Sequence, residues 1–215
     1  MAAVLPLIAP QNYELIRERI GLVITEELTQ QGELETTNPF TVPTVYIERI
    51  WPFNSGEQLP AINVCLYKAD YYPYGGIQQK GEYVFTIDVY TNSDSTSATD
   101  IAQRGDKLAS VQMHRIIGKV RSILGSPTYS TLGFAKGDVS GNVGIEGKIE
   151  LSGFVVADKS QMPDALNSTV GRMYLKVKVP EVSVYSGTVN LIEISNITSI
   201  LVEGQYGYQF QFPQT

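Results

Sequence analysis

The residue types that most often carry out chemistry are few and scattered in this chain. Among 215 residues there is one histidine, His114, and one cysteine, Cys65. His114 falls beside the apolar stripe of a predicted helix and has no second ligand at a metal-binding spacing. Cys65 lies inside a predicted strand, where a thiol most often packs as a small apolar group. A single cysteine forms neither an intrachain disulfide nor a cysteine-based zinc site.

The carboxylates are more numerous, but they follow no catalytic motif. The sequence contains no HExxH, no GxSxG and no phosphate-binding glycine loop. Scattered carboxylates that meet in space would suit a hydrolase with a carboxylate pair, and that alternative stays open. These residues are Glu26, Glu27, Glu33, Glu35, Asp70, Asp88, Asp94 and Asp100. We predict no catalytic residue, no metal site and no cofactor.

Clustered aromatic residues predict a surface that binds something. Such clusters serve as protein interfaces or as sugar-binding platforms, and local packing at a hairpin tip is the simpler alternative. Near the end of the chain, aromatic residues alternate with Gly and Gln, which predicts a strand whose aromatic edge would pair with another chain. The candidate interface residues are Trp51, Phe53, Tyr71, Tyr72, Tyr74, Val143, Ile145, Tyr206, Tyr208 and Phe210.

The elements that would position these residues are clearest between residues 59 and 124. Apolar and polar residues alternate along Ala61–Tyr67 and Glu82–Tyr90, which predicts two half-buried antiparallel strands. We expect Thr86 and Asp88 on the wet face. A helix over Ser97–Leu124 follows, and its apolar residues recur at helical spacing, so it should cover the apolar face of the strands. They are Ala109, Met113, Ile116, Val120 and Ile123.

The rest of the chain supplies one more helix and further strands. A helix is expected from Pro10 to about Thr29, then a polar linker to Pro43 and a short strand, Val45–Ile50. Residues 137–153 are glycine-rich and read as an extended arm or hairpin. Short strands are expected at Phe154–Ala157 and, joining the main sheet, at Arg172–Val179.

The predicted fold class follows from these elements. It is α+β, a mostly antiparallel sheet with two helices packed on one face, plus a β-rich C-terminal extension and the glycine-rich arm. We place an α+β domain at residues 1–180 and the extension at 181–215.

The composition excludes some classes of function. The net charge of -6 is opposite to that of a nonspecific nucleic-acid binder. A charged fraction of only 18% suits a surface largely covered by neighbours, and equally an extracellular β protein. No stretch is long and apolar enough to span a membrane, and the first residues lack the basic start of a signal peptide. We expect a soluble protein made in the cytoplasm.

The order of elements, with particular strand sequences, resembles the tail terminator proteins of long-tailed bacteriophages. An N-terminal helix and a strand precede Leu-Pro-Ala-Ile-Asn-Val-Cys-Leu-Tyr at 59–67. Then come a glycine-bearing loop, Gly-Glu-Tyr-Val-Phe-Thr-Ile-Asp-Val-Tyr at 81–90, the helix at 97–124 and a late strand at 170–179. The likeness covers roughly residues 10–180. The arm at 137–153 and the segment 181–215 depart from the usual pattern and suggest further contacts with tail, sheath or neck proteins.

The resemblance implies a virion structural protein that is not an enzyme. Copies would form a homo-oligomeric ring, typically hexameric, on the tail tube protein, ending tube growth and offering a joint to the head-tail connector. A sheath protein is a further implied partner. DNA would pass through the lumen without specific binding, which the acidic balance favours. The protein would be assembled in the host cytoplasm and reside in the tail-neck region of the virion, without a membrane. Another neck or tail-completion protein, or a carbohydrate- or surface-binding β-module, is the alternative.

Overall fold

The computed structural model describes residues 11–36, 40–49, 59–73, 79–92, 105–136, 144–156 and 168–181. All of them belong to one compact unit, Pro10–Ser183. Its helices are α1 (Asn12–Leu34), α2 (Gly105–Leu124) and a 3-10 turn η2 (Pro127–Tyr129). Its strands are β1 (Thr44–Ile47), β2 (Ala61–Pro73), β3 (Gln79–Asn92), β4 (Ala135–Lys136), β5 (Gly144–Ile145), β6 (Glu150–Val156) and β7 (Ser168–Glu181).

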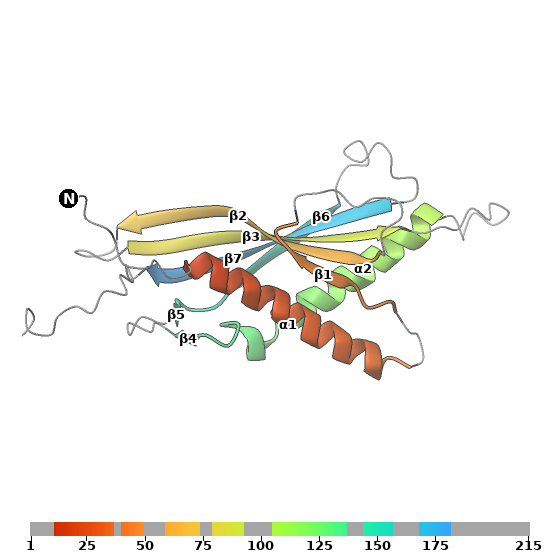
Figure 1. Ribbon diagram of the computed structural model, residues 1–215, viewed down its shortest axis with the longest axis horizontal. Helices are drawn as coiled ribbons and strands as arrows, with labels where there is room; N and C mark the ends of the chain where they lie inside the picture. Colours follow the sequence, from red (N-terminus) through yellow and green to blue (C-terminus); the bar gives the residue numbers. More distant parts are fainter. Residues whose placement is uncertain are drawn as a thin grey trace, which may run out of the picture. The chain divides into compact units, whose positions relative to one another are not determined.

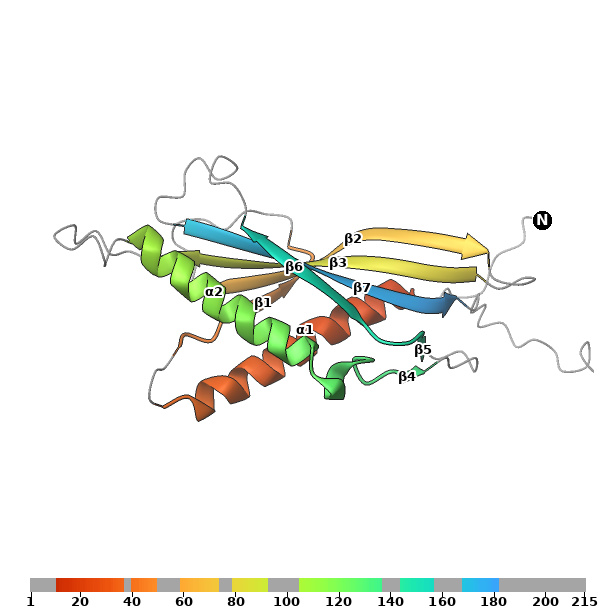
Figure 2. The ribbon, with the colours of Figure 1, turned by 180° about the vertical axis from the view of Figure 1, so that it is seen from behind.

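Five strands form the main sheet in the order β1-β2-β3-β7-β6, and β4 and β5 form a small parallel pair. The pairs β2–β3, β3–β7 and β7–β6 are antiparallel, whereas β1 is parallel to β2. Among the described strands, β1 and β6 are therefore the two edges of the main sheet. Both helices lie on the same side of this sheet (Figures 1 and 2). The predicted α+β class and the mostly antiparallel sheet with its two helices are confirmed for the described residues.

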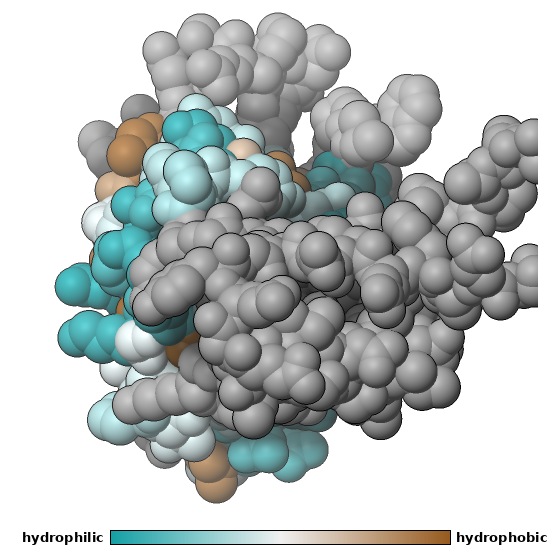
Figure 3. Space-filling model, turned by 90° about the vertical axis from the view of Figure 1, so that its left-hand side faces the viewer, coloured by the Kyte–Doolittle hydropathy of each residue, from teal (hydrophilic) through white to brown (hydrophobic). Residues whose placement is uncertain are grey.

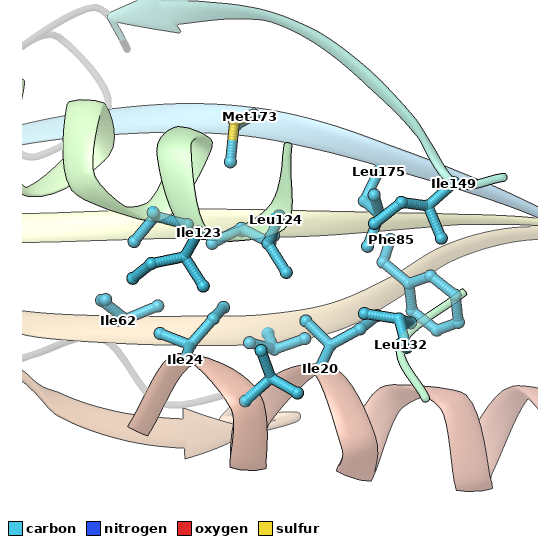
Figure 4. Packing of buried hydrophobic residues seen from close by; sticks show 14 of the residues in the cluster. Ile20, Ile24, Ile62, Phe85, Ile123, Leu124, Leu132, Ile149, Met173 and Leu175 are labelled. Atoms are coloured by element: carbon cyan, nitrogen blue, oxygen red, sulfur yellow. The ribbon is translucent and has the colours of Figure 1, made fainter. Parts of the chain in front are cut away.

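The core lies between the sheet and the two helices. Alternate residues of the strands point toward the helices, so Ile62 lies beside Ile24 of α1, and Leu175 lies beside Ile149 in the same buried cluster (Figure 4). The predicted apolar stripe of α2 is confirmed, because every one of its members is buried. Gly171 of β7 permits this packing, since a Cβ there would collide with Ile117 and Met113.

The first helix is longer than the sequence predicted. It continues through Leu34, over part of the expected polar linker. Gln and Glu are adequate helix formers, and the residue that ends the helix is held by tertiary contacts. The carboxylate of Glu35 forms ion pairs with Arg115 and Lys119 of α2, the latter at 2.7 Å. A contact between helices therefore decides where α1 ends.

The expected glycine-rich arm is wrong over residues 144–149, whereas residues 150–153 are extended and belong to β6. Ile145 and Ile149 are buried in the core, and the turn between them uses Gly147 at φ +79°. The Glu146 N–H donates to the Lys178 carbonyl at 2.7 Å, and the Ile149 N–H donates to the Ser130 carbonyl at 2.9 Å. Two apolar side chains inserted into the core keep this segment against its own domain. Residues 137–143 lie outside the described residues.

Candidate interaction surfaces

The outer face of the sheet, away from the helices, carries matched charges. Lys176 lies 2.8 Å from Glu82, and Lys68 lies 2.7 Å from Asp70. These pairs follow from the alternation of the strands, because each lysine shares a face with a carboxylate on its own or a neighbouring strand. The sheet therefore presents a nearly neutral polar surface on this side.

One ion pair on this outer face is much less hydrated than the others. Arg172 of β7 stands opposite Asp88 of β3, and two guanidinium nitrogens donate to the two carboxylate oxygens at 2.7 Å each. Asp88 is 3% exposed and Thr86 is also buried, so the prediction that both side chains are solvent-exposed is wrong. The hydrogen bonds from Arg172 replace water around the carboxylate and raise the pKa of the guanidinium.

Where β1 ends, the side chains of Glu48 and Asn63 form hydrogen bonds with backbone groups in place of a neighbouring strand. Glu48 adopts φ 51°, which stops the strand, and its Oε1 accepts from the Leu66 N–H at 2.7 Å. The buried Asn63 amide donates to the Arg49 carbonyl at 2.9 Å and accepts from the Arg49 N–H at 3.0 Å. These contacts extend the β1 edge beyond its last residue. Sequence reasoning missed both roles, although a lone Asn in an apolar strand was a usable signal.

A polar cleft lies between the C-terminal halves of the two helices and η2. It has a volume of about 690 Å³, and its lining includes Glu27, Arg115, Lys119 and Tyr129. The charges in it are already paired: Tyr129 donates to Glu27, and Arg115 donates to Glu35. The bonds from Lys119 and Arg115 hold the pKa of Glu35 below its usual value. Because each charge has a partner, the cleft resembles a junction between helices more than a binding site.

Neither of two further titratable groups on the sheet is set up for catalysis. Burial raises the pKa of Cys65 to about 11, so its reactive thiolate is scarce at neutral pH. Burial also raises the pKa of Tyr90 to about 12, and the charge of Asp88 adds to this shift. His114 is exposed, and its ring lies 5.5 Å from that of Phe154. In the described part of the chain, no group of three or more His, Cys, Asp or Glu could hold a metal ion.

The structure brings together only part of the predicted interface set. Tyr71 and Tyr72 are half-exposed near the end of β2, where the Tyr71 ring packs 6.1 Å from that of Tyr83. From the side on which β2 ends, polar colours predominate among the described atoms, and hydrophobic ones form small separate areas (Figure 3). An interface role for Tyr71 and Tyr72 therefore stays a prediction. Tyr71 also packs locally, against Tyr83 of its own domain.

Ile145 is a correction to that set. It is fully buried inside its own domain, because the β5 segment directs it into the core. The other seven candidates lie outside the described residues: Trp51, Phe53, Tyr74, Val143, Tyr206, Tyr208 and Phe210.

The clearest apolar surface of the described residues was not predicted. Phe154, Val155 and Val156 of the edge strand β6 are 41%, 62% and 47% exposed. We name these three residues the β6 patch. A run of consecutive apolar residues usually marks a strand covered on both faces, and the sequence does not show that this one lies at a sheet edge. An exposed apolar edge strand is prone to pairing with another chain.

Neither of the two long helices in the described residues has a stretch apolar enough to cross a membrane. No protein-family model matches the chain, and no curated protein matches its sequence.

Proposed function

We propose that this chain is a virion structural protein, a tail terminator. Copies of it form a closed ring on the last ring of a phage tail tube. The ring ends tube polymerisation and offers its other side to the head-side connector. In this role the protein acts through shape and contacts alone and performs no catalysis.

The observation that carries the proposal is the open sheet with two unlike edges. A cyclic ring of more than two subunits needs two different surfaces on each subunit, one for each neighbour. The edges β1 and β6 lie on opposite flanks of the sheet and differ in length, sequence and exposure. One of them carries the β6 patch. The sheet therefore offers the kind of asymmetric flanks that a ring requires.

Two further features support the same role. The order α1, β1, β2, β3, α2 and β7 is the order on which the resemblance to tail terminators rests. The outer face of the sheet pairs its lysines with carboxylates, and the whole chain carries a net charge of -6. Surfaces without excess positive charge let DNA pass through a lumen without binding it.

The experiment is to image the protein at high concentration, alone and with purified tail tubes, and to weigh its assemblies by native mass spectrometry. We expect rings of one size in solution or at tube ends, and tubes that no longer elongate once they carry the protein. A protein that stays monomeric alone and leaves tube growth unchanged would exclude the proposal. Rings bound elsewhere in the neck would instead favour another tail-completion protein.

A carbohydrate- or surface-binding module is the second candidate. It is supported by the half-exposed Tyr71 and Tyr72, since tyrosine rings serve as platforms for sugars. Binding to a glycan array that is lost in Tyr72→Ala, with unchanged thermal stability, would favour this candidate over the terminator.

A further inference from the structure

The β6 patch lies where a further strand would add to the sheet. β6 pairs with β7 on one side only, and no described strand lies on its other side. In Figure 2 this strand runs across the front of the sheet. By its pairing with Met173, Phe154 belongs to the face that carries the helices, and Val155 belongs to the outer face because it pairs with Arg172. An added strand would therefore need apolar residues on both faces.

The opposite edge of the same sheet meets that requirement. β1 is four residues long and carries no charge. Its Val45 and Ile47 lie toward the helix face, near Gly21 of α1, whereas Tyr46 lies on the outer face. The β6 patch carries no charge either. β1 is short and β6 has an irregular register between Leu151 and Phe154, but neither strand contains the lysines or prolines by which natural edges also prevent pairing.

The strand directions make the two edges compatible. β1 and β2 run the same way, β3 runs opposite, β7 reverses again, and β6 runs opposite to β1. A rotation about an axis along the strands repeats the sheet without changing any of these directions. In such a ring, β6 of one copy meets β1 of the next copy antiparallel, which is the more stable arrangement per residue.

We propose that β6 pairs antiparallel with β1 of a second copy of this chain, so that the sheet continues from subunit to subunit. This inference rests on the ring of the proposed function and specifies its lateral contact. The register sets Phe154 opposite Ile47, Val155 opposite Tyr46, and Val156 opposite Val45. Each pair then joins two apolar or aromatic side chains on the same face of the sheet. A slip by one residue would turn every side chain of one strand to the wrong face.

The first test is disulfide formation between copies in a Cys65→Ser background. Val155→Cys and Tyr46→Cys are made as separate proteins and mixed at high concentration under mild oxidation. We expect a linked dimer that contains one chain of each kind, and little linkage in either protein alone. The chain that carries both substitutions should give a ladder of linked multimers.

The other outcomes separate the two proposals. Linkage in Val155→Cys alone would show that β6 meets β6 across a two-fold axis, which overturns the inference. Rings without mixed linkage would also overturn it but leave the terminator function standing. No ring, in solution or on tail tubes, and no linkage would overturn both.

The second test needs no cysteine. Val155→Glu should weaken assembly at least tenfold, because it places a charge at the apolar junction. The matched control is Val111→Glu, since Val111 is 56% exposed on α2 and lies outside both edge strands. Thermal unfolding of both variants checks that the monomer is intact. Equal assembly of the two variants would contradict the proposed contact.

Discussion

The two faces of the main sheet are built from the same strands but are stabilised differently. The inner face meets α1 and α2 and is mostly apolar, as in the cluster around Phe85 and Leu175, although Thr91 and Thr169 are also buried there. The outer face carries ion pairs, yet the exposed fractions of Asp88, Thr86 and Asn63 there are only 3%, 4% and 4%. Alternation along a strand therefore shows which side chains share a face, whereas the neighbours of each polar group decide whether it meets water.

The largest expected difference between the faces comes from removing an aromatic ring. Phe85→Ala should cost about 3–5 kcal/mol of unfolding free energy, because Phe85 is fully buried in the core and its removal leaves an enclosed cavity. Tyr174→Ala on the outer face is the matched change. Its half-buried ring contacts only that of Tyr67 among the described aromatic residues, so we expect about 1–2 kcal/mol. Urea unfolding measures both, and equal losses would mean that the outer face is packed like the core.

Substitutions in the Asp88–Arg172 pair test whether Asp88 is shielded from water on the outer face of the sheet. Arg172→Met leaves a carboxylate that is 3% exposed without its partner, whereas Asp88→Asn leaves an arginine side chain that is 43% exposed. We expect a loss of about 3–4 kcal/mol in the first case and about 1–2 kcal/mol in the second.

Urea unfolding at neutral pH measures both losses. Equal losses in the two variants would contradict the asymmetric burial of the pair.

The alkylation rate of the Cys65 thiol tests the same face, and we expect a smaller effect there. With its pKa raised to about 11, the thiolate at pH 8 is scarcer in the folded chain than in the unfolded one. Alkylation by iodoacetamide should be at least tenfold slower in buffer than in denaturant. Because the pKa of Cys65 is raised in the folded chain, the contribution of this thiol to the unfolding free energy is fully present below pH 9. That contribution is lost as the pH rises through 11. Equal alkylation rates in the two conditions would show an open outer face at this position.

The smallest effect is expected for an ion pair that water reaches. Lys176 lies 2.8 Å from Glu82, and both side chains are partly exposed. Lys176→Ala should leave the urea midpoint close to that of the wild type, and added salt should reduce any difference. A loss as large as that of Arg172→Met would place this pair with Asp88–Arg172 rather than with ordinary surface pairs.

Much of the fold followed from periodicity along the chain. The alternation in β2, β3 and β7 and the stripe of α2 predicted which residues are buried, because strand and helix geometry assign each position to a face. The length of α1 and the packing of Ile145 were mispredicted. Both depend on contacts between distant segments, Glu35 with α2 and residues 144–149 with β7.

Of the candidate surfaces, the sequence predicted the exposure of Tyr71 and Tyr72 but not the β6 patch. A short apolar run is compatible with a central strand or an edge strand, and only the pairing order distinguishes them. Aromatic residues drew attention because of their type, while Val155 is significant only because of its position.

Local periodicity by itself determined the class of fold, the core face of each long strand and the helix stripe, since these need only the repeat of the backbone. The tertiary structure alone decided that Asp88 is buried and that β6 is an edge among the described strands. It also decided that β6 runs in the direction opposite to β1. Those properties belong to pairs of segments far apart in the chain, and the spacing of residues within one segment does not encode them.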